Sequence, residues 1–121
     1  MNGIPWWAWA LAVMAGAVGA VLRTFLVTVF PRRPVPVGVL TANVTASVVG
    51  GAVVAARGGL GAAWTLVLVG GICGGLSTLS TLAADTVELW REGRRGGALG
   101  NVLANLVLGL AGAWLAWAAV S

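Results

Sequence analysis

The residues of this chain best suited to chemistry are concentrated between Gly70 and Leu82. Four glycines fall within the first six residues of this stretch, and four hydroxyl residues fall within five residues soon after them. Because each glycine in a helix interior costs about 0.5–1 kcal/mol relative to alanine, the stretch predicts an interrupted helix. An interruption exposes main-chain carbonyl oxygens, which are good ligands for a hard cation such as sodium, and hydroxyl groups, which can donate to an anion. The stretch therefore predicts an ion-binding site.

Two polar residues lie in apolar stretches before this region, Arg23 and Asn43. Polar groups in hydrocarbon must find partners, so such residues are functional candidates. Arg23 lies about seven residues, or roughly 10 Å, before the end of its apolar segment, and both a vestibule or structural role and an interfacial anchor remain open. Asn43 shares a helix face with Ser47 at i, i+4 spacing, and we expect Asn43 to contribute to the site.

Other polar residues fit a simpler interpretation. Asparagines and glycines follow one side of the last apolar segment, as is typical of helix–helix packing, in which small residues allow close contact and amides hydrogen-bond across it: Asn101, Asn105, Gly109 and Gly112. Asp85 precedes Glu88 and Glu92 near the end of its segment, so the mouth of a pathway and a hydrated helix end both remain open.

Composition excludes most soluble functions. Of the 121 residues, 60% are hydrophobic and 8% are charged, against about 45–50% and about 25% in soluble domains. The seven arginines and three acidic residues give a net charge of +4, but the arginines lie between apolar runs, so we expect no nucleic-acid partner. The chain has one cysteine and no histidine, and its glycine-rich stretch lacks the lysine of a phosphate-binding loop. We expect no enzyme activity.

The elements that must position these residues are membrane helices, each of which needs about 20 mostly apolar residues. The sequence predicts an all-α membrane protein with a single domain over residues 1–121, four transmembrane helices and a third helix broken near the midplane. The first helix lacks the basic start and cleavage site of a signal peptide, so we expect it to be retained. The four predicted spans are Trp6–Phe30, Val35–Ala56, Leu60–Ala84 and Gly97–Val120.

Loop arginines predict the orientation of these spans. The second loop carries Arg57 alone, whereas the first and third loops together carry five arginines: Arg32, Arg33, Arg91, Arg94 and Arg95. Cytoplasmic loops are enriched in positive charge. We therefore expect the first and third loops in the cytoplasm and both termini outside.

Three features together resemble the Fluc (CrcB) family of fluoride channels. They are the run GGLSTLSTL at 74–82, the pattern Gly-x-x-x-Arg ending at Arg23, and Asn43 in the second span. The match covers all four spans in order. The resemblance implies a multi-pass protein of the cell membrane, surrounded by lipid, whose subunits pair antiparallel and let fluoride ions leave the cytoplasm passively, which reduces fluoride toxicity.

The resemblance also implies roles for single residues. Main-chain carbonyls of Gly74 and Ser77 would hold a structural sodium ion that is not transported, at the centre of the dimer. Arg23 matches the family's first-helix arginine, and Asp85 occupies the place of a carboxylate near one end of a pathway, which gives both a vestibule or structural role.

The implied fluoride pathway passes Asn43, Leu79, Ser80, Thr81 and Leu82. The family normally carries phenylalanine at positions 79 and 82, where the electropositive ring edges contact fluoride, and leucine has no such edge. The five-to-one imbalance of loop arginines also differs from the balance expected of a chain that inserts in both orientations. We therefore expect either a homodimer or, in better agreement with both features, one half of a heterodimer with a related subunit that carries the phenylalanines.

Two other functions fit parts of the sequence. A non-conducting accessory or assembly subunit would explain the glycine stripes and the missing phenylalanines. A small multidrug exporter is a weaker fit, because it needs a carboxylate embedded in its first helix, where this chain carries Arg23.

Overall fold

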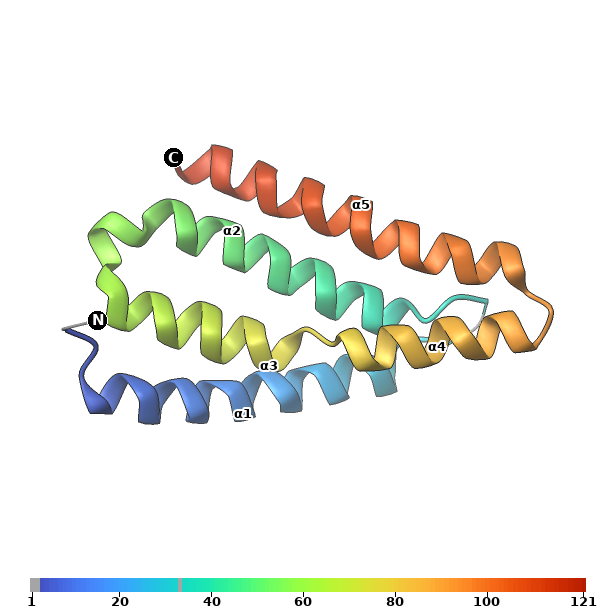
Figure 1. Ribbon diagram of the computed structural model, residues 1–121, viewed down its shortest axis with the longest axis horizontal. Coiled ribbons are helices and arrows are strands. Elements are labelled where there is room, and N and C mark those ends of the chain that lie inside the picture. The colour runs from blue at the N-terminus through green and yellow to red at the C-terminus, as the bar shows by residue number, and fades with distance from the viewer. Residues whose placement is uncertain (1–2, 33) are drawn as a thin grey trace.

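The computed structural model describes residues 3–32 and 34–121. Arg33, one of the five loop arginines behind the orientation prediction, lies outside the described residues. Every regular element in the described residues is helical, as predicted (Figure 1). In chain order these elements are α1 (Trp6–Val29), α2 (Val37–Thr65), the π-helical segment η1 (Leu66–Cys73), α3 (Gly74–Leu76), α4 (Leu79–Arg91) and α5 (Arg95–Val120).

The prediction of four separate long helices is corrected to three long helical runs. Trp6–Val29, Val37–Arg91 and Arg95–Val120 are each long and apolar enough to cross a membrane, and the middle run contains 55 residues. A straight helix of that length would extend about 80 Å, far beyond a hydrocarbon core of about 30 Å. The run is not straight, because Gly61 (φ 82°, ψ 169°) turns the chain back beside itself (Figure 1).

The reversal occurs later than expected. The sequence placed the end of the second span at Ala56, before Arg57-Gly58-Gly59, but these residues are helical and Gly61 makes the turn. A positive φ is accessible to glycine because it has no Cβ. Beyond the turn, η1 packs against both α1 and α2.

Glycines let the helix backbones touch. A Cβ on Gly75 of α3 would collide with the carbonyl oxygen of Gly16 in α1, and one on Gly51 of α2 would collide with the carbonyl oxygen of Ala113 in α5. Such contact between small residues is how membrane helices associate when lipid is as apolar as their side chains. α5 therefore lies along α2, while α1 lies along η1 and α3.

The predicted break in the third segment is present, but it does not lie at the glycines. The glycines of the stretch 70–75 all lie within η1 and α3. The helix instead ends at Leu76, and Ser77 (φ −77°, ψ 153°) and Thr78 (φ −149°, ψ 114°) are extended before α4 begins. The hydroxyl residues, rather than the glycines, form the break.

Polar and apolar residues are separated along the bundle. Large hydrophobic side chains such as Val13, Val21 and Leu110 are exposed on the long helices, as expected of a lipid-facing surface.

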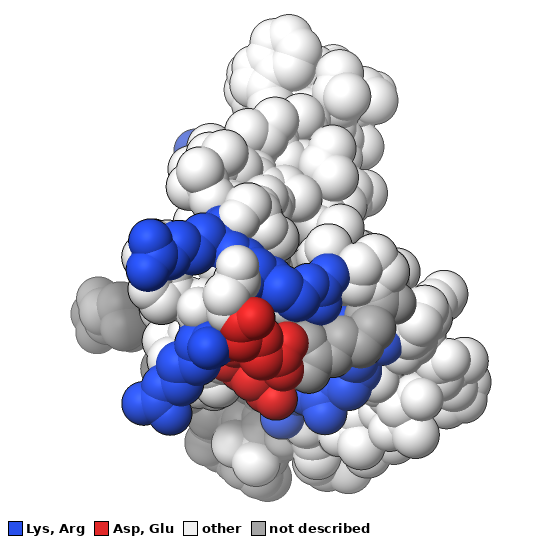
Figure 2. Space-filling view, turned by 90° about the vertical axis from the view of Figure 1, so that its right-hand side faces the viewer, with Lys and Arg blue, Asp and Glu red and all other residues white. Residues whose placement is uncertain are grey.

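Both termini and the Gly61 turn lie at one end of the bundle (Figure 1), where the rings of Trp7 and Trp64 meet with centroids 5.9 Å apart. At the other end the acidic side chains form one patch with arginines around it (Figure 2).

Candidate functional site

Asn43 of α2 binds both polar groups of the Thr78 main chain. The Thr78 N–H donates to Asn43 Oδ1 at 2.7 Å, and Asn43 Nδ2 donates to the Thr78 carbonyl oxygen at 3.3 Å. The first bond gives the Thr78 N–H a partner in place of the Gly74 carbonyl, since a buried main-chain group must find a partner. The second adds a donor to the Thr78 carbonyl at the start of α4. The side chain predicted to belong to the site therefore holds the break itself.

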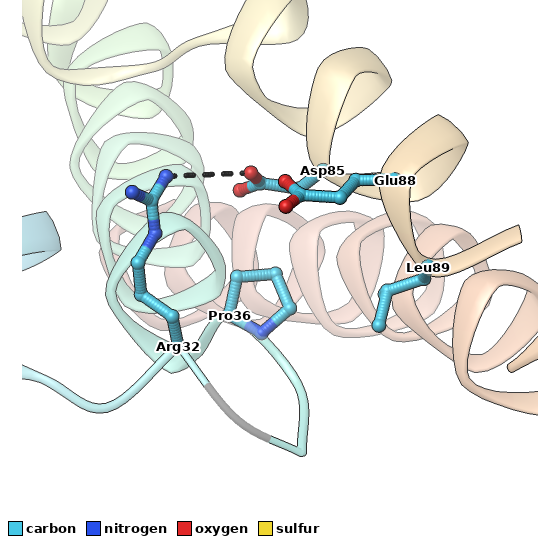
Figure 3. Close-up of a pocket in the computed structure, with 5 residues that line it drawn as sticks. All are labelled: Arg32, Pro36, Asp85, Glu88 and Leu89. Carbon is cyan, nitrogen blue, oxygen red and sulfur yellow. Dashed lines mark hydrogen bonds and ion pairs between the residues drawn. The ribbon is translucent and has the colours of Figure 1, made fainter. Parts of the chain in front are cut away.

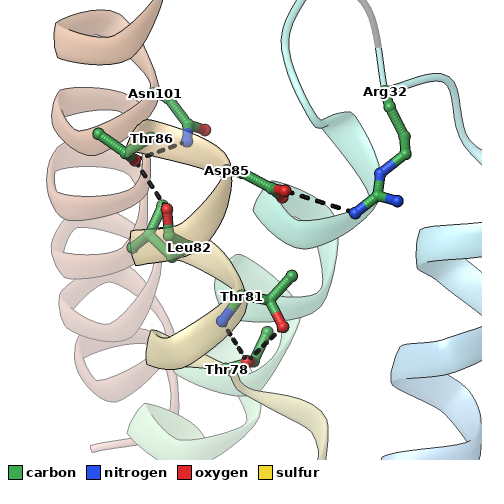
Figure 4. Close-up of polar contacts among 7 residues, drawn as sticks. All are labelled: Arg32, Thr78, Thr81, Leu82, Asp85, Thr86 and Asn101. Carbon is green, nitrogen blue, oxygen red and sulfur yellow. Dashed lines mark hydrogen bonds and ion pairs between the residues drawn. The ribbon is translucent and has the colours of Figure 1, made fainter. Parts of the chain in front are cut away.

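Thr78 also caps α4. Its Oγ1 accepts a hydrogen bond from the Thr81 N–H at 3.2 Å and donates to Thr81 Oγ1 at 3.0 Å, as shown in Figure 4. Ser80 Oγ lies 3.4 Å from Thr78 Oγ1. A threonine at the N-cap satisfies one of the free N–H groups at a helix start, so the sequence Ser-Thr at 77–78 both ends one helix and begins the next.

These contacts engage two N–H groups that would bind carbonyl oxygens in a continuous helix. In an α-helix the carbonyl of residue i accepts from the N–H of residue i+4, so the donors for Gly74 and Ser77 would be Thr78 and Thr81. The Thr78 N–H is bound to Asn43 and the Thr81 N–H is bound to Thr78 Oγ1. The carbonyls of Gly74 and Ser77 therefore lose these helical donors. The carbonyls of Gly75 and Leu76 lose theirs as well, because Leu79 and Ser80 begin the next helix.

A ladder of amides continues from Asn43 into α5 and α4. Asn43 Nδ2 donates to Asn105 Oδ1 at 2.8 Å, and Asn105 Nδ2 donates to the Asn101 main-chain oxygen at 2.8 Å. Asn101, which is 0% exposed, donates through Nδ2 to Thr86 Oγ1 at 3.1 Å, and Thr86 donates to the Leu82 carbonyl at 2.7 Å (Figure 4). The two α5 asparagines thus belong to the network around the break.

The acidic residue proposed for a vestibule is tied to the first loop. Asp85 of α4 is 8% exposed, and its Oδ1 accepts a hydrogen bond from Arg32 Nη2 at 3.4 Å. Among the described residues its Oδ2 has no hydrogen-bond partner. The carboxyl groups of Asp85 and Glu88 lie on the side of α4 that faces Arg32 (Figure 3). Together with Pro36 and Leu89 they line a cavity of about 100 Å³.

Arg23 lies elsewhere, beside Thr81. It is partly buried and lines a hollow of about 260 Å³ with Thr24, Val27, Thr28 and Thr81. The hydroxyls of Thr24 and Thr28 donate to carbonyls of their own helix at 2.9 and 2.7 Å. Their hydrogens are therefore engaged, which leaves the Arg23 guanidinium and the Thr81 hydroxyl as the hydrogen-bond donors for an anion in this hollow.

The positions implied for the pathway differ in exposure. Leu79 is 79% exposed and Ser80 is exposed, whereas Thr81 and Leu82 are partly buried. In the described residues, hydrogen bonds join Asn43 to Thr78 and Asn105 and do not join it to Ser80 or Thr81. The structure therefore brings Asn43 to the start of the hydroxyl run rather than along it.

Four residues around the break and at Asp85 have contacts that were not assigned to them from the sequence: Thr78, Asn101, Asn105 and Arg32. Thr78 was expected only as one of the hydroxyl donors, Asn101 and Asn105 only in helix packing, and Arg32 only in orientation. The i, i+4 spacing of Asn101 and Asn105 was visible in the sequence, but nothing in one sequence says which helix that face meets. The Arg32 contact spans 53 residues along the chain, so only the loop charge of Arg32 could be recognised beforehand.

Comparison with known proteins agrees with the resemblance. Residues 10–117 match the family described as CrcB-like protein, Camphor Resistance (CrcB). The fluoride-specific ion channel FluC of Pseudomonas aeruginosa strain UCBPP-PA14 is 39% identical over 102 residues, which is 79% of this chain and 80% of that protein. The FluC of Renibacterium salmoninarum is 36% identical over 113 residues, 84% and 90% of the two chains. FluC 2 of Haloarcula marismortui is 39% identical over 105 residues, 87% of each.

Proposed function

The chain belongs to the CrcB-like family and is a multi-pass integral membrane protein of the cell membrane, and we propose that it is a subunit of a fluoride-specific ion channel. Such a subunit lets fluoride leave the cell passively and so lowers fluoride toxicity in the cytoplasm. The observation that carries the proposal is the similarity, over most of both chains, to relatives named fluoride-specific ion channels.

The proposal includes four membrane crossings. The Gly61 turn divides the 55-residue run into two arms that lie side by side, and each arm has the length of one crossing. A second subunit inserted in the opposite sense would cover the exposed Leu79 and meet the break.

A structural sodium ion is proposed at the break, held by the main-chain carbonyls of Gly74 and Ser77. Support comes from the two redirected donors, because Asn43 and Thr78 take the N–H groups that these carbonyls would otherwise bind. Carbonyl oxygens suit a hard cation, and two carbonyls from each of two subunits would supply four oxygens. The ion would hold the subunits together electrostatically and would not be transported.

The proposed fluoride pathway passes the break at Asn43 and continues past Leu79, Ser80, Thr81 and Leu82. Fluoride gives up its water only where donors replace it, because moving an ion into an apolar medium costs tens of kcal/mol. Thr81 supports this assignment, since its hydroxyl accepts from Thr78 and keeps its own hydrogen for another acceptor. Arg23 would attract the anion toward Thr81, and Asp85 with Arg32 would lie at one mouth.

Heterodimer formation is proposed from the leucines at 79 and 82. An exposed leucine at 79 presents only aliphatic surface to a partner, so the aromatic ring edges for fluoride would come from a related subunit. The same observation favours a second candidate function, a non-conducting subunit that completes the dimer.

Reconstitution into liposomes tests these alternatives. We expect fluoride efflux, measured with a fluoride electrode, to exceed chloride efflux strongly when this chain is combined with a related subunit that carries the phenylalanines. Strong efflux from this chain alone would contradict obligate pairing. Efflux that requires only the partner's pathway residues would identify this chain as the non-conducting subunit, and no efflux from any combination would contradict the channel function.

A further inference from the structure

We propose that Asn43 acts as a positioning residue that keeps the helix break open, and that Asn105 and Asn101 fix the direction of its amide. The geometry of this proposal stands on the contacts of the chain, while its consequence for conduction rests on the proposed function. It changes the role of Asn43 from a donor to fluoride into the residue that shapes the place where ions bind.

All of the hydrogen-bonding groups of the Asn43 amide are engaged. An asparagine amide has two N–H hydrogens and one carbonyl oxygen. One Nδ2 hydrogen goes to the Thr78 carbonyl and the other goes to Asn105 Oδ1 at 2.8 Å, while Asn43 Oδ1 accepts from the Thr78 N–H. Both hydrogens are engaged, so Asn43 has no N–H left for an anion while it holds the break.

The orientation of the Asn105 amide is determined by the main chain of α5. Asn105 can present its oxygen to Asn43 because its own Nδ2 donates to the Asn101 main-chain carbonyl at 2.8 Å. That carbonyl can only accept, so Asn105 cannot turn its amide over without placing two oxygens together. The main chain of α5 therefore determines that Asn105 offers an acceptor, and this acceptor in turn holds the Asn43 amide.

The hydrogen-bond network ends in α4, on the C-terminal side of the break. Asn101 donates to Thr86 Oγ1, and Thr86 donates to the Leu82 carbonyl in α4. The network thus starts at the Thr78 main chain and ends at the Leu82 main chain, with α5 as the support between them. In a dry, apolar setting, losing any one of these hydrogen bonds leaves a donor without a partner. Breaking a single bond of the network is therefore costly.

The consequence concerns Gly74. If Asn43 let go, the Thr78 N–H would be free to return to the Gly74 carbonyl, its i+4 acceptor in a continuous helix. The break would then close on the oxygen that is proposed to face sodium. We infer that α5, through Asn105, controls whether the Gly74 carbonyl is available to a cation.

Two variants of the full chain test the proposal. Asn105→Leu removes the acceptor for Asn43. Leu106→Ala truncates the next residue, an exposed leucine outside the network. Hydrogen exchange at the Thr78 amide is measured in reconstituted protein, so the readout does not depend on transport.

We expect the Thr78 amide to exchange about tenfold faster in Asn105→Leu, because one supporting hydrogen bond is lost. Leu106→Ala should exchange within about twofold of the parent. Unchanged exchange in Asn105→Leu, or equal acceleration in Leu106→Ala, would overturn the proposal.

Fluoride efflux separates this proposal from the proposed function. If the chain and its partner conduct, Asn105→Leu should lower efflux several-fold while Leu106→Ala leaves it unchanged. If no combination conducts but Thr78 exchange still responds to Asn105→Leu alone, the positioning role holds and the channel function fails. If efflux is intact and Thr78 exchange is unaffected in Asn105→Leu, the channel function holds and the positioning role fails.

Discussion

Thr78 connects more of the site than any other single residue described above. Its main-chain N–H and carbonyl bind Asn43, and its hydroxyl binds both the N–H and the hydroxyl of Thr81. Through these bonds it withholds donors from the carbonyls of Gly74 and Ser77. A threonine is suited to this position because it favours extended backbone and carries an oxygen that can cap a helix.

Replacing Thr78 with valine keeps the shape of the side chain and removes its oxygen. The N-cap of α4 would be lost and the Thr81 N–H would become free to bind the Ser77 carbonyl. We expect the free energy of unfolding to fall by about 1 kcal/mol, measured by thermal denaturation in detergent. As a control, Thr65→Val removes a hydroxyl that binds only Gly61 O of its own helix. An equal loss in both variants would contradict the capping role.

The Arg32–Asp85 pair gives a second prediction at this scale. Arg32→Ala would leave the carboxylate of Asp85 nearly buried without its cation, and a negative charge at a pathway mouth opposes an anion. If the proposed pathway is correct, we expect fluoride efflux from the reconstituted protein to fall several-fold in Arg32→Ala and to recover when Asp85→Asn is added.

Because the Arg32 side chain is 60% exposed, the effect of this pair on stability should stay below about 1 kcal/mol. Arg57→Ala, which removes an arginine near the other end of the bundle, provides the matched charge control. Equal efflux from Arg32→Ala and Arg57→Ala would rule out a specific role for the pair.

The helices show what one sequence could and could not predict. Apolar length located the first and last helices within about two residues, because the hydrophobic effect acts on each segment independently of its neighbours. It did not reveal that the second and third predicted spans form one helical run, Val37–Arg91. The break was also predictable in outline. Its position was not, because the glycines of 70–75 remain helical where α1 packs closely against them, and Asn43, 35 residues away, supplies the bonds that stabilise extended backbone at Thr78.

The position of the turn within α2 was predicted wrongly for a related reason. Gly58, Gly59 and Gly61 can all adopt a positive φ, and only Gly61 does so. No local signal distinguishes these three glycines. The choice depends on where α2 and η1 must end to pack against each other and against α1, which is a property of the assembled helices.

Helix contact at Gly75 provides a test at this scale. A methyl group there would collide with the Gly16 carbonyl, so α1 and α3 would have to separate. We expect Gly75→Ala to lower the free energy of unfolding by about 1–3 kcal/mol, as overpacking does. Gly100→Ala, in open space on α5, should be neutral or stabilising by up to about 1 kcal/mol. Thermal denaturation in detergent compares the two, and equal stability would contradict the close contact.

At the scale of the molecule, charge distinguishes the two ends of the bundle. The connections after α1 and after α4 lie together, with acidic and basic side chains around them (Figure 2), while the termini and the Gly61 turn lie at the opposite end (Figure 1). The arginine excess at the end that carries the connections after α1 and α4 is the feature that predicts a fixed orientation.

Site-specific labelling tests that orientation. In a Cys73→Ser background, Ser121→Cys and Gly96→Cys place one thiol near each end of the bundle. We expect an impermeant maleimide added to intact cells to label Ser121→Cys fully and Gly96→Cys only after permeabilisation. Partial labelling of both in intact cells would instead show that the chain inserts in both orientations.

The tight reversal at Gly61 also constrains how the protein is made. With only one residue at the bend, the two arms of the run are too closely joined to insert separately. In the proposed arrangement of four crossings they would enter the bilayer as a pair, and Arg57, four residues before the bend, would cross with them. A guanidinium at the centre of a membrane helix costs about 2.5–3.5 kcal/mol, so in that arrangement insertion would depend on the apolar surface of the two arms.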